Sequence, residues 1–100
     1  MTAASILSLS AEAEYLTRLL YRQYLDSRES GMGKGEAYSI GDADYIYKLM
    51  CRSGVLLSLA GVGKAVGELY KNNLISKDHW GYVTLHGGFV DFCMRNHVKV

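Results

Sequence analysis

The two cysteines and three histidines are the side chains of this chain best suited to bind a metal ion. Cys93 and His97 are separated by a helical i,i+4 spacing, which can place two ligands on one metal. Two further ligands, such as Cys51 and His86, would have to come from elsewhere, because no Cys-x-x-Cys or His-x-x-x-His pair is present. We therefore expect no metal site, and we expect both cysteines to be reduced, small apolar side chains.

Residues 55–67, VLLSLAGVGKAVG, combine an apolar run with three spaced glycines. Such glycines can let a backbone approach a pyrophosphate at a helix N-terminus. No series of strand–helix units surrounds the segment, however, and Ser58 and Ala65 stand where a phosphate-binding loop needs Gly and Ser or Thr. The chain also lacks the Gly-x-Ser-x-Gly and His-Glu-x-x-His patterns of hydrolases. We expect neither a cofactor nor an enzymatic activity.

The composition predicts one ordered domain. Of the 100 residues, 49% are hydrophobic and 21% are charged, which argues against intrinsic disorder. No apolar run is long enough to span a bilayer, and the apolar segment Met1–Leu9 lacks the basic flank of a signal peptide, so we expect a cytoplasmic protein. The net charge is only +1, so any surface for nucleic acid must arise by local segregation of charge.

A first helix is predicted from Ser10 to about Glu29. Ser10 is a suitable N-cap, and Gly31 is a suitable residue to end the helix in a left-handed conformation. Apolar side chains recur every three or four residues and define the buried face: Leu9, Ala13, Leu16, Leu20 and Tyr24. Residues 1–9 are expected to be a tail that can be disordered.

Two more helices are predicted in the middle of the chain. Gly31–Gly41 reads as a glycine-rich, irregular connection that could include a helical turn at Glu36–Ser39. Asp42 then caps a short helix to about Arg52, with Ile46, Leu49 and Met50 directed inward.

The next segment leads into a third helix. The apolar run Val55–Leu59 is a strand or the start of that helix, and periodicity over five residues does not separate the two. Ser58 caps the helix, which ends near Asn72. Its predicted inward face is Val62, Ala65, Val66, Leu69 and Tyr70, and its outward face is Lys64, Gly67, Glu68 and Lys71.

The pattern changes after Asn73. Leu74–Ile75 and Trp80–Leu85 read as two short strands around the polar turn Ser76–His79. A last helix is predicted from about Phe89 to Asn96, with Phe89, Phe92 and Cys93 inward.

This order of elements resembles a winged helix-turn-helix domain. The likeness lies chiefly in AVGELYKNNLISKDHWGYVTLHGGFVDFCMRN, where Leu85, Gly88 and Phe92 occupy positions comparable to those of the family. The front half, EYLTRLLYRQYLDSRESGMGKGEAYSIGDADYI, resembles small winged-helix proteins of low-GC Gram-positive bacteria and their phages. The resemblance implies one α+β domain over residues 1–100. It would comprise an extra N-terminal helix over residues 10–30 and a winged-helix core over residues 42–96.

The resemblance further implies a regulator that binds double-stranded DNA. Ser58–Asn72 would be the recognition helix and Ser76–Trp80 the wing tip. Glu68 and Asp78 interrupt these basic elements, and no arginine occurs between residues 53 and 94. A protein-interaction module that binds no DNA is therefore the alternative. The candidate DNA contacts are Lys64, Gly67, Lys71, Lys77, Arg18 and Arg22.

The first helix also predicts a homodimer. Tyr15, Leu19 and Leu25 lie away from the main apolar stripe, as an interface would require. Across a two-fold axis, Arg22 of one chain could meet Asp26 of the other. The alternative is that Tyr15 and Leu19 pack beneath the glycine-rich connection of the same chain.

Overall fold

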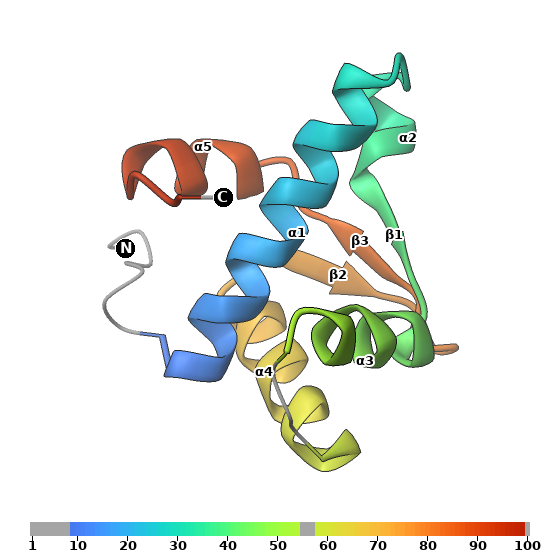
Figure 1. Ribbon diagram of the computed structural model, residues 1–100, viewed down its shortest axis with the longest axis vertical. Coiled ribbons are helices and arrows are strands. Elements are labelled where there is room, and N and C mark those ends of the chain that lie inside the picture. The colour runs from blue at the N-terminus through green and yellow to red at the C-terminus, as the bar shows by residue number, and fades with distance from the viewer. Residues whose placement is uncertain (1–8, 55–57, 100) are drawn as a thin grey trace.

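The computed structural model describes residues 9–54 and 58–99, and within these ranges it contains five helices and a three-stranded antiparallel sheet. The predicted α+β class is therefore confirmed (Figure 1). Most of the predicted tail and of the Val55–Leu59 run lies outside the described residues. No helix in the described ranges is long and apolar enough to cross a membrane.

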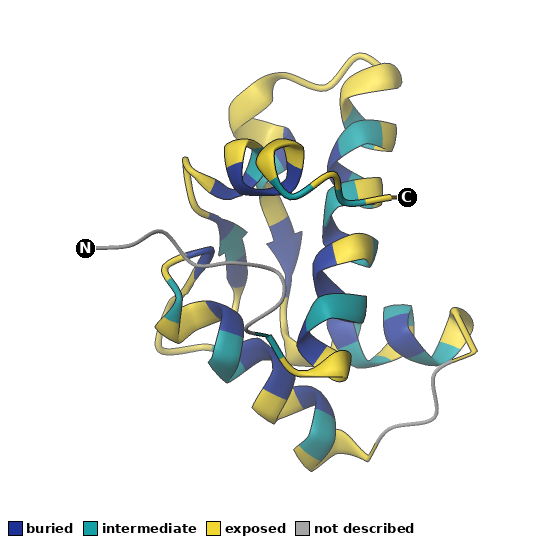
Figure 2. Ribbon diagram, turned by 90° about the vertical axis from the view of Figure 1, so that its left-hand side faces the viewer, coloured by how far each residue is buried: buried dark blue, intermediate teal, exposed yellow. Residues whose placement is uncertain are grey.

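Helix α1 (Ala11–Glu29) forms as predicted and lies in front of the sheet in Figure 1. The Ser10 hydroxyl accepts a hydrogen bond from the Ala13 N–H at 3.2 Å, which satisfies one of the free donors of the first turn. Gly31 follows the helix with a φ of 98°. The buried residues of α1 recur every three or four positions, and buried segments are dark blue in Figure 2. They are Ala13, Leu16, Thr17, Leu20 and Tyr24.

The glycine-rich connection contains more regular structure than predicted. A short helix, α2 (Lys34–Tyr38), leads directly into strand β1 (Ser39–Gly41). The Tyr38 ring stacks on Tyr24 of α1, with 5.5 Å between centroids. A helical turn was expected at Glu36–Ser39 within an irregular segment. That expectation was wrong for Ser39–Gly41, which form a strand. A strand of three residues shows no periodicity of its own, and its backbone is fixed by pairing with a distant segment.

Helices α3 (Ala43–Arg52) and α4 (Leu59–Lys71) begin at the predicted caps. Asp42 accepts from the Tyr45 N–H, and Ser58 accepts from the Gly61 N–H. The inward faces are also largely as predicted. Leu49 is only half-buried, and Tyr70 is 47% exposed, so the inward position predicted for Tyr70 was wrong. The Tyr70 ring instead lies under the Lys77 ammonium, 5.1 Å from it.

Strands β2 (Ile75–Lys77) and β3 (Val83–Leu85) form a hairpin as predicted, with Ile75 opposite Leu85 and Lys77 opposite Val83. The predicted turn at Ser76–His79 was wrong for Ser76 and Lys77, which belong to β2 because they pair with β3. Strand β3 is central, because β1 pairs with its other edge. The second strand was expected to start at Trp80. Residues 78–82 form the connecting loop instead, because the backbone N–H groups of Trp80, Gly81 and Tyr82 donate hydrogen bonds to Asp78 within the turn.

Helix α5 (Phe89–Arg95) ends the described fold, and its buried residues are those predicted. The Phe89 ring meets Tyr21 of α1 edge-on, with 6.5 Å between centroids. Helix α5 therefore contributes large aromatic groups to the same core that α1 enters, together with β2, β3 and α4.

We expect Phe89→Ala to lower the free energy of unfolding by about 3–5 kcal/mol, because a fully buried ring would leave a cavity. Met94→Ala is the matched control in the same helix. Met94 is 61% exposed, and its truncation should change stability by less than about 0.5 kcal/mol. Urea denaturation followed by circular dichroism measures both. Equal effects of the two substitutions would contradict the placement of α5.

Candidate nucleic-acid interface

The exposed face of α4 brings together three of the candidate DNA contacts. Lys64, Gly67 and Lys71 line one wall of a groove of about 540 Å³ beside the start of α1. Ser10 and Glu12 line the opposite wall. Both lysine side chains are exposed, Lys64 near the middle of the helix and Lys71 at its end. Helix α4 therefore presents two accessible cations along one groove.

Glu68, which lies between these lysines in the sequence, is held by the chain itself. Its carboxylate accepts a hydrogen bond of 2.6 Å from the backbone N–H of Ser10, at the N-terminus of α1. The positive end of the α1 dipole favours an anion at this place. Glu68 is half-buried there, so Lys64 and Lys71 are the more accessible charges of this face.

The acidic residue of the hairpin has a similar structural use. The Asp78 carboxylate accepts hydrogen bonds from the N–H groups of Trp80 and Tyr82, at 2.9 and 3.0 Å. The Asp78 N–H donates to the Tyr82 carbonyl, and the Gly81 N–H donates to the Asp78 carbonyl. Gly81 adopts a φ of 83°, which favours glycine. Asp78 thus organises the turn that presents Lys77, itself exposed at the end of β2.

Trp80 is a surface feature that the strand prediction missed. Its side chain is 78% exposed at the end of the hairpin, and the His79 ring lies 4.5 Å from it. The sequence contained a signal for this position, because Trp80 lies between Asp78 and Gly81, two residue types that favour turns.

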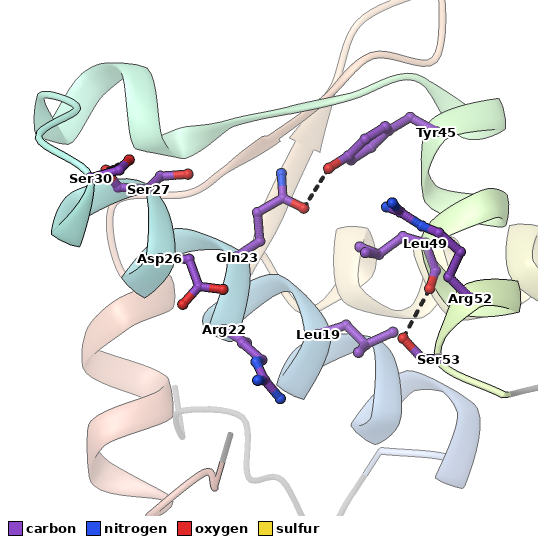
Figure 3. A pocket seen from close by; sticks show the side chains of 10 residues that line it. All are labelled: Leu19, Arg22, Gln23, Asp26, Ser27, Ser30, Tyr45, Leu49, Arg52 and Ser53. Atoms are coloured by element: carbon purple, nitrogen blue, oxygen red, sulfur yellow. Dashed lines mark hydrogen bonds between the residues drawn. The ribbon is translucent and has the colours of Figure 1, made fainter.

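The remaining candidate cations lie on α1. Arg18 forms an exposed ion pair of 3.8 Å with Glu14. Arg22 lines a second groove, of about 710 Å³, formed with residues of α3 that include Arg52 (Figure 3). Arg22 and Arg52 extend in different directions in this groove (Figure 3). The structure therefore groups Lys64 with Lys71 and places Arg22 in another groove.

The candidate dimer contacts are partly occupied within the chain. Tyr15, Leu19 and Leu25 are half-buried and pack against the core. The Tyr15 hydroxyl donates to the Ser53 carbonyl at 3.0 Å, beyond the end of α3. Leu19 lines the α1–α3 groove with Arg22 and Asp26, both of which are exposed. Tyr15 and Leu19 thus face α3 in their own chain, and the homodimer stays a prediction.

The two cysteines lie in different environments. Cys51 is half-buried in α3, whereas Cys93 is buried in α5, where burial raises the pKa of its thiol to about 12. A hydrogen bond with Cys51 raises the pKa of the Tyr47 hydroxyl. In residues 9–54 and 58–99, no three His, Cys, Asp or Glu side chains lie together as a metal site would need.

We expect iodoacetamide at about pH 8 to alkylate Cys51 well before Cys93, because only the thiolate reacts and Cys93 remains protonated and covered. Peptide mass spectrometry over time gives the two rates. In the Cys51→Ser variant, labelling should become rapid only after denaturation. Equal rates in the native protein would contradict the buried position of Cys93.

The turn at Asp78 can be tested by two substitutions at the same position. Asp78→Ala removes the acceptor of two backbone N–H groups and should lower the free energy of unfolding by about 1–2 kcal/mol. Asp78→Asn keeps an acceptor oxygen in a residue that turns favour, so it should retain most of the stability. Urea titration compares them, and equal destabilisation would show that the carboxylate charge, not the acceptor geometry, holds the turn.

Comparison with known proteins provides no family for these surfaces. No protein-family model matches the sequence, and no curated protein and no solved structure shows significant similarity to it. The geometry and charge of α4 and the hairpin are therefore what bears on their function.

Proposed function

We propose that this chain is a winged-helix DNA-binding protein in which α4 contacts the duplex and the β2–β3 hairpin acts as the wing. The order of elements supports this proposal. Helices α1 and α2 and strand β1 precede the α3–α4 helix pair, and a hairpin follows whose second strand pairs with β1. An exposed second helix next to a hairpin is the arrangement with which helix-turn-helix proteins enter the major groove.

The observation that carries the proposal is the distribution of charge around α4. Lys64, Lys71 and Lys77 are exposed, while Glu68 and Asp78 accept hydrogen bonds from backbone N–H groups of the chain. Both carboxylates are thus committed to structural contacts. The three ammonium groups are then available to phosphate oxygens, the contacts that supply affinity without reading sequence.

The absence of arginine from this part of the sequence shapes the expected binding. Arginine is the usual bidentate reader of guanine, whereas lysine acts as a point charge. We therefore infer that α4 contributes mainly phosphate contacts and that the discrimination between duplex sequences is weak. A cytoplasmic regulator related to those of low-GC Gram-positive bacteria or their phages, acting as a homodimer, is the biological setting we propose. Two weak contacts per dimer would reinforce one another.

We expect the double variant Lys64→Ala/Lys71→Ala to weaken binding to duplexes of unrelated sequence to a similar extent. The slope of log affinity against log salt concentration should become shallower by about 2, because two phosphate contacts are lost. The matched control is Lys34→Ala/Lys99→Ala, which removes the same charge from α2 and from the segment after α5, away from α4 (Figure 1). Fluorescence anisotropy of a labelled duplex measures the affinity of each variant.

If the control variant loses as much affinity and salt dependence as the α4 variant, α4 is not the contact surface. If the wild-type protein binds no duplex at low salt, the chain is not a DNA-binding protein. The second candidate, a protein-interaction module, then remains. Leu59 on α4 and Met94 on α5, which are 63% and 61% exposed, are the large apolar side chains that such a partner would contact.

A further inference from the structure

The hairpin displays the only tryptophan of the chain on a backbone that is already ordered. The backbone N–H of Trp80 donates to the Asp78 carboxylate. The backbone N–H groups of Gly81 and Tyr82 donate to the Asp78 carbonyl and carboxylate. The indole is nevertheless 78% exposed. A partner would therefore meet a large apolar ring without having to order the loop that carries it, which lowers the entropic cost of binding.

The surroundings of Trp80 favour one kind of partner. Tryptophans that anchor protein interfaces are usually enclosed by further contacts that exclude water. Trp80 instead lies in the turn between His79, whose ring is 4.5 Å from the indole, and Gly81. The same hairpin carries the exposed Lys77 at the end of β2. An exposed flat ring on a hairpin that also exposes a lysine fits a narrow apolar slot bordered by negative charge. The space between two bases, bordered by phosphates, has this chemistry.

We propose that Trp80 stacks on a nucleobase, so that the protein binds duplexes with an unpaired or easily unstacked base more tightly than fully paired duplexes. The proposal rests on the DNA-binding function proposed above and adds a second, distinct contact to it. Lysines on α4 and β2 hold phosphates, and Trp80 distinguishes duplexes by how readily a base can be reached. Unstacking a base costs free energy, and an unpaired base lowers that cost.

The single tryptophan makes this contact directly observable, because all indole emission comes from the tip of the hairpin. Two labelled duplexes of the same sequence, one fully paired and one with a central unpaired base, are titrated with the protein. Anisotropy of the label reports binding, and Trp80 emission reports stacking. We expect tighter binding of the interrupted duplex and strong quenching of Trp80 in that complex.

Variants at the same position separate stacking from general binding. Trp80→Ala should lower the affinity for the interrupted duplex about tenfold and bring it close to that of the paired duplex. Trp80→Phe should keep part of the preference, because a smaller ring still stacks. Met94→Ala, which removes an exposed apolar side chain on α5, should change neither affinity. Thermal unfolding of each variant verifies that the fold is retained, as expected for exposed positions.

Two results would overturn the proposal, and they differ in what they say of the DNA-binding function. Binding of both duplexes without quenching, and with equal affinities in the wild type and Trp80→Ala, would remove Trp80 from the contact and leave the α4 surface standing. Failure of the wild type to bind either duplex at low salt would overturn both proposals together.

Discussion

Burial of one face of α1 is the constraint on which the rest of the structure depends. Helices α2, α3, α4 and α5 all contact α1 (Figure 1). Leu16 and Leu20 at the middle of α1 are completely buried, and Tyr24 near its end supports the α2 segment by ring stacking. In a domain of this size the core is thin, so a single central helix must supply contacts to most of the other elements.

The position of α1 also determines how α4 presents its charges. The N-terminus of α1 lies against α4 closely enough for the Ser10 N–H to bind the Glu68 carboxylate. That contact directs an acidic side chain toward a helix end where a negative charge is stabilised. It leaves Lys64 and Lys71 along the edge of the same groove. The packing that stabilises the fold and the charge pattern of the candidate interface thus have a common origin.

A nearly neutral chain can in this way expose lysines beside a carboxylate that its own backbone binds, although the exposed Glu12 lines the same groove. The net charge of +1 gives no indication of this arrangement, because the acidic residues balance the basic ones in number. The acidic and basic side chains differ in whether they are bound within the chain. Asp42 caps a helix, Asp78 closes a turn and Glu68 binds a helix end, so these carboxylates are engaged by backbone N–H groups. Lys64, Lys71 and Lys77 form no ion pair with any residue in the described ranges.

The sequence by itself determined the features whose cause lies within a few residues. The caps Ser10, Asp42 and Ser58 each bind an N–H three residues ahead, and the buried stripe of α1 follows from helical periodicity, so both were predicted correctly. Lys64 and Lys71 could be assigned to one face of α4 for the same reason.

Tertiary structure decided the features whose partners are remote in sequence. Strand β1 forms because it pairs with β3, and no local sequence pattern predicts that pairing. The exposure of Tyr70, the contact of Tyr15 with Ser53 and the engagement of Glu68 by Ser10 were likewise set by how the elements pack, because each depends on a segment that folding brings close.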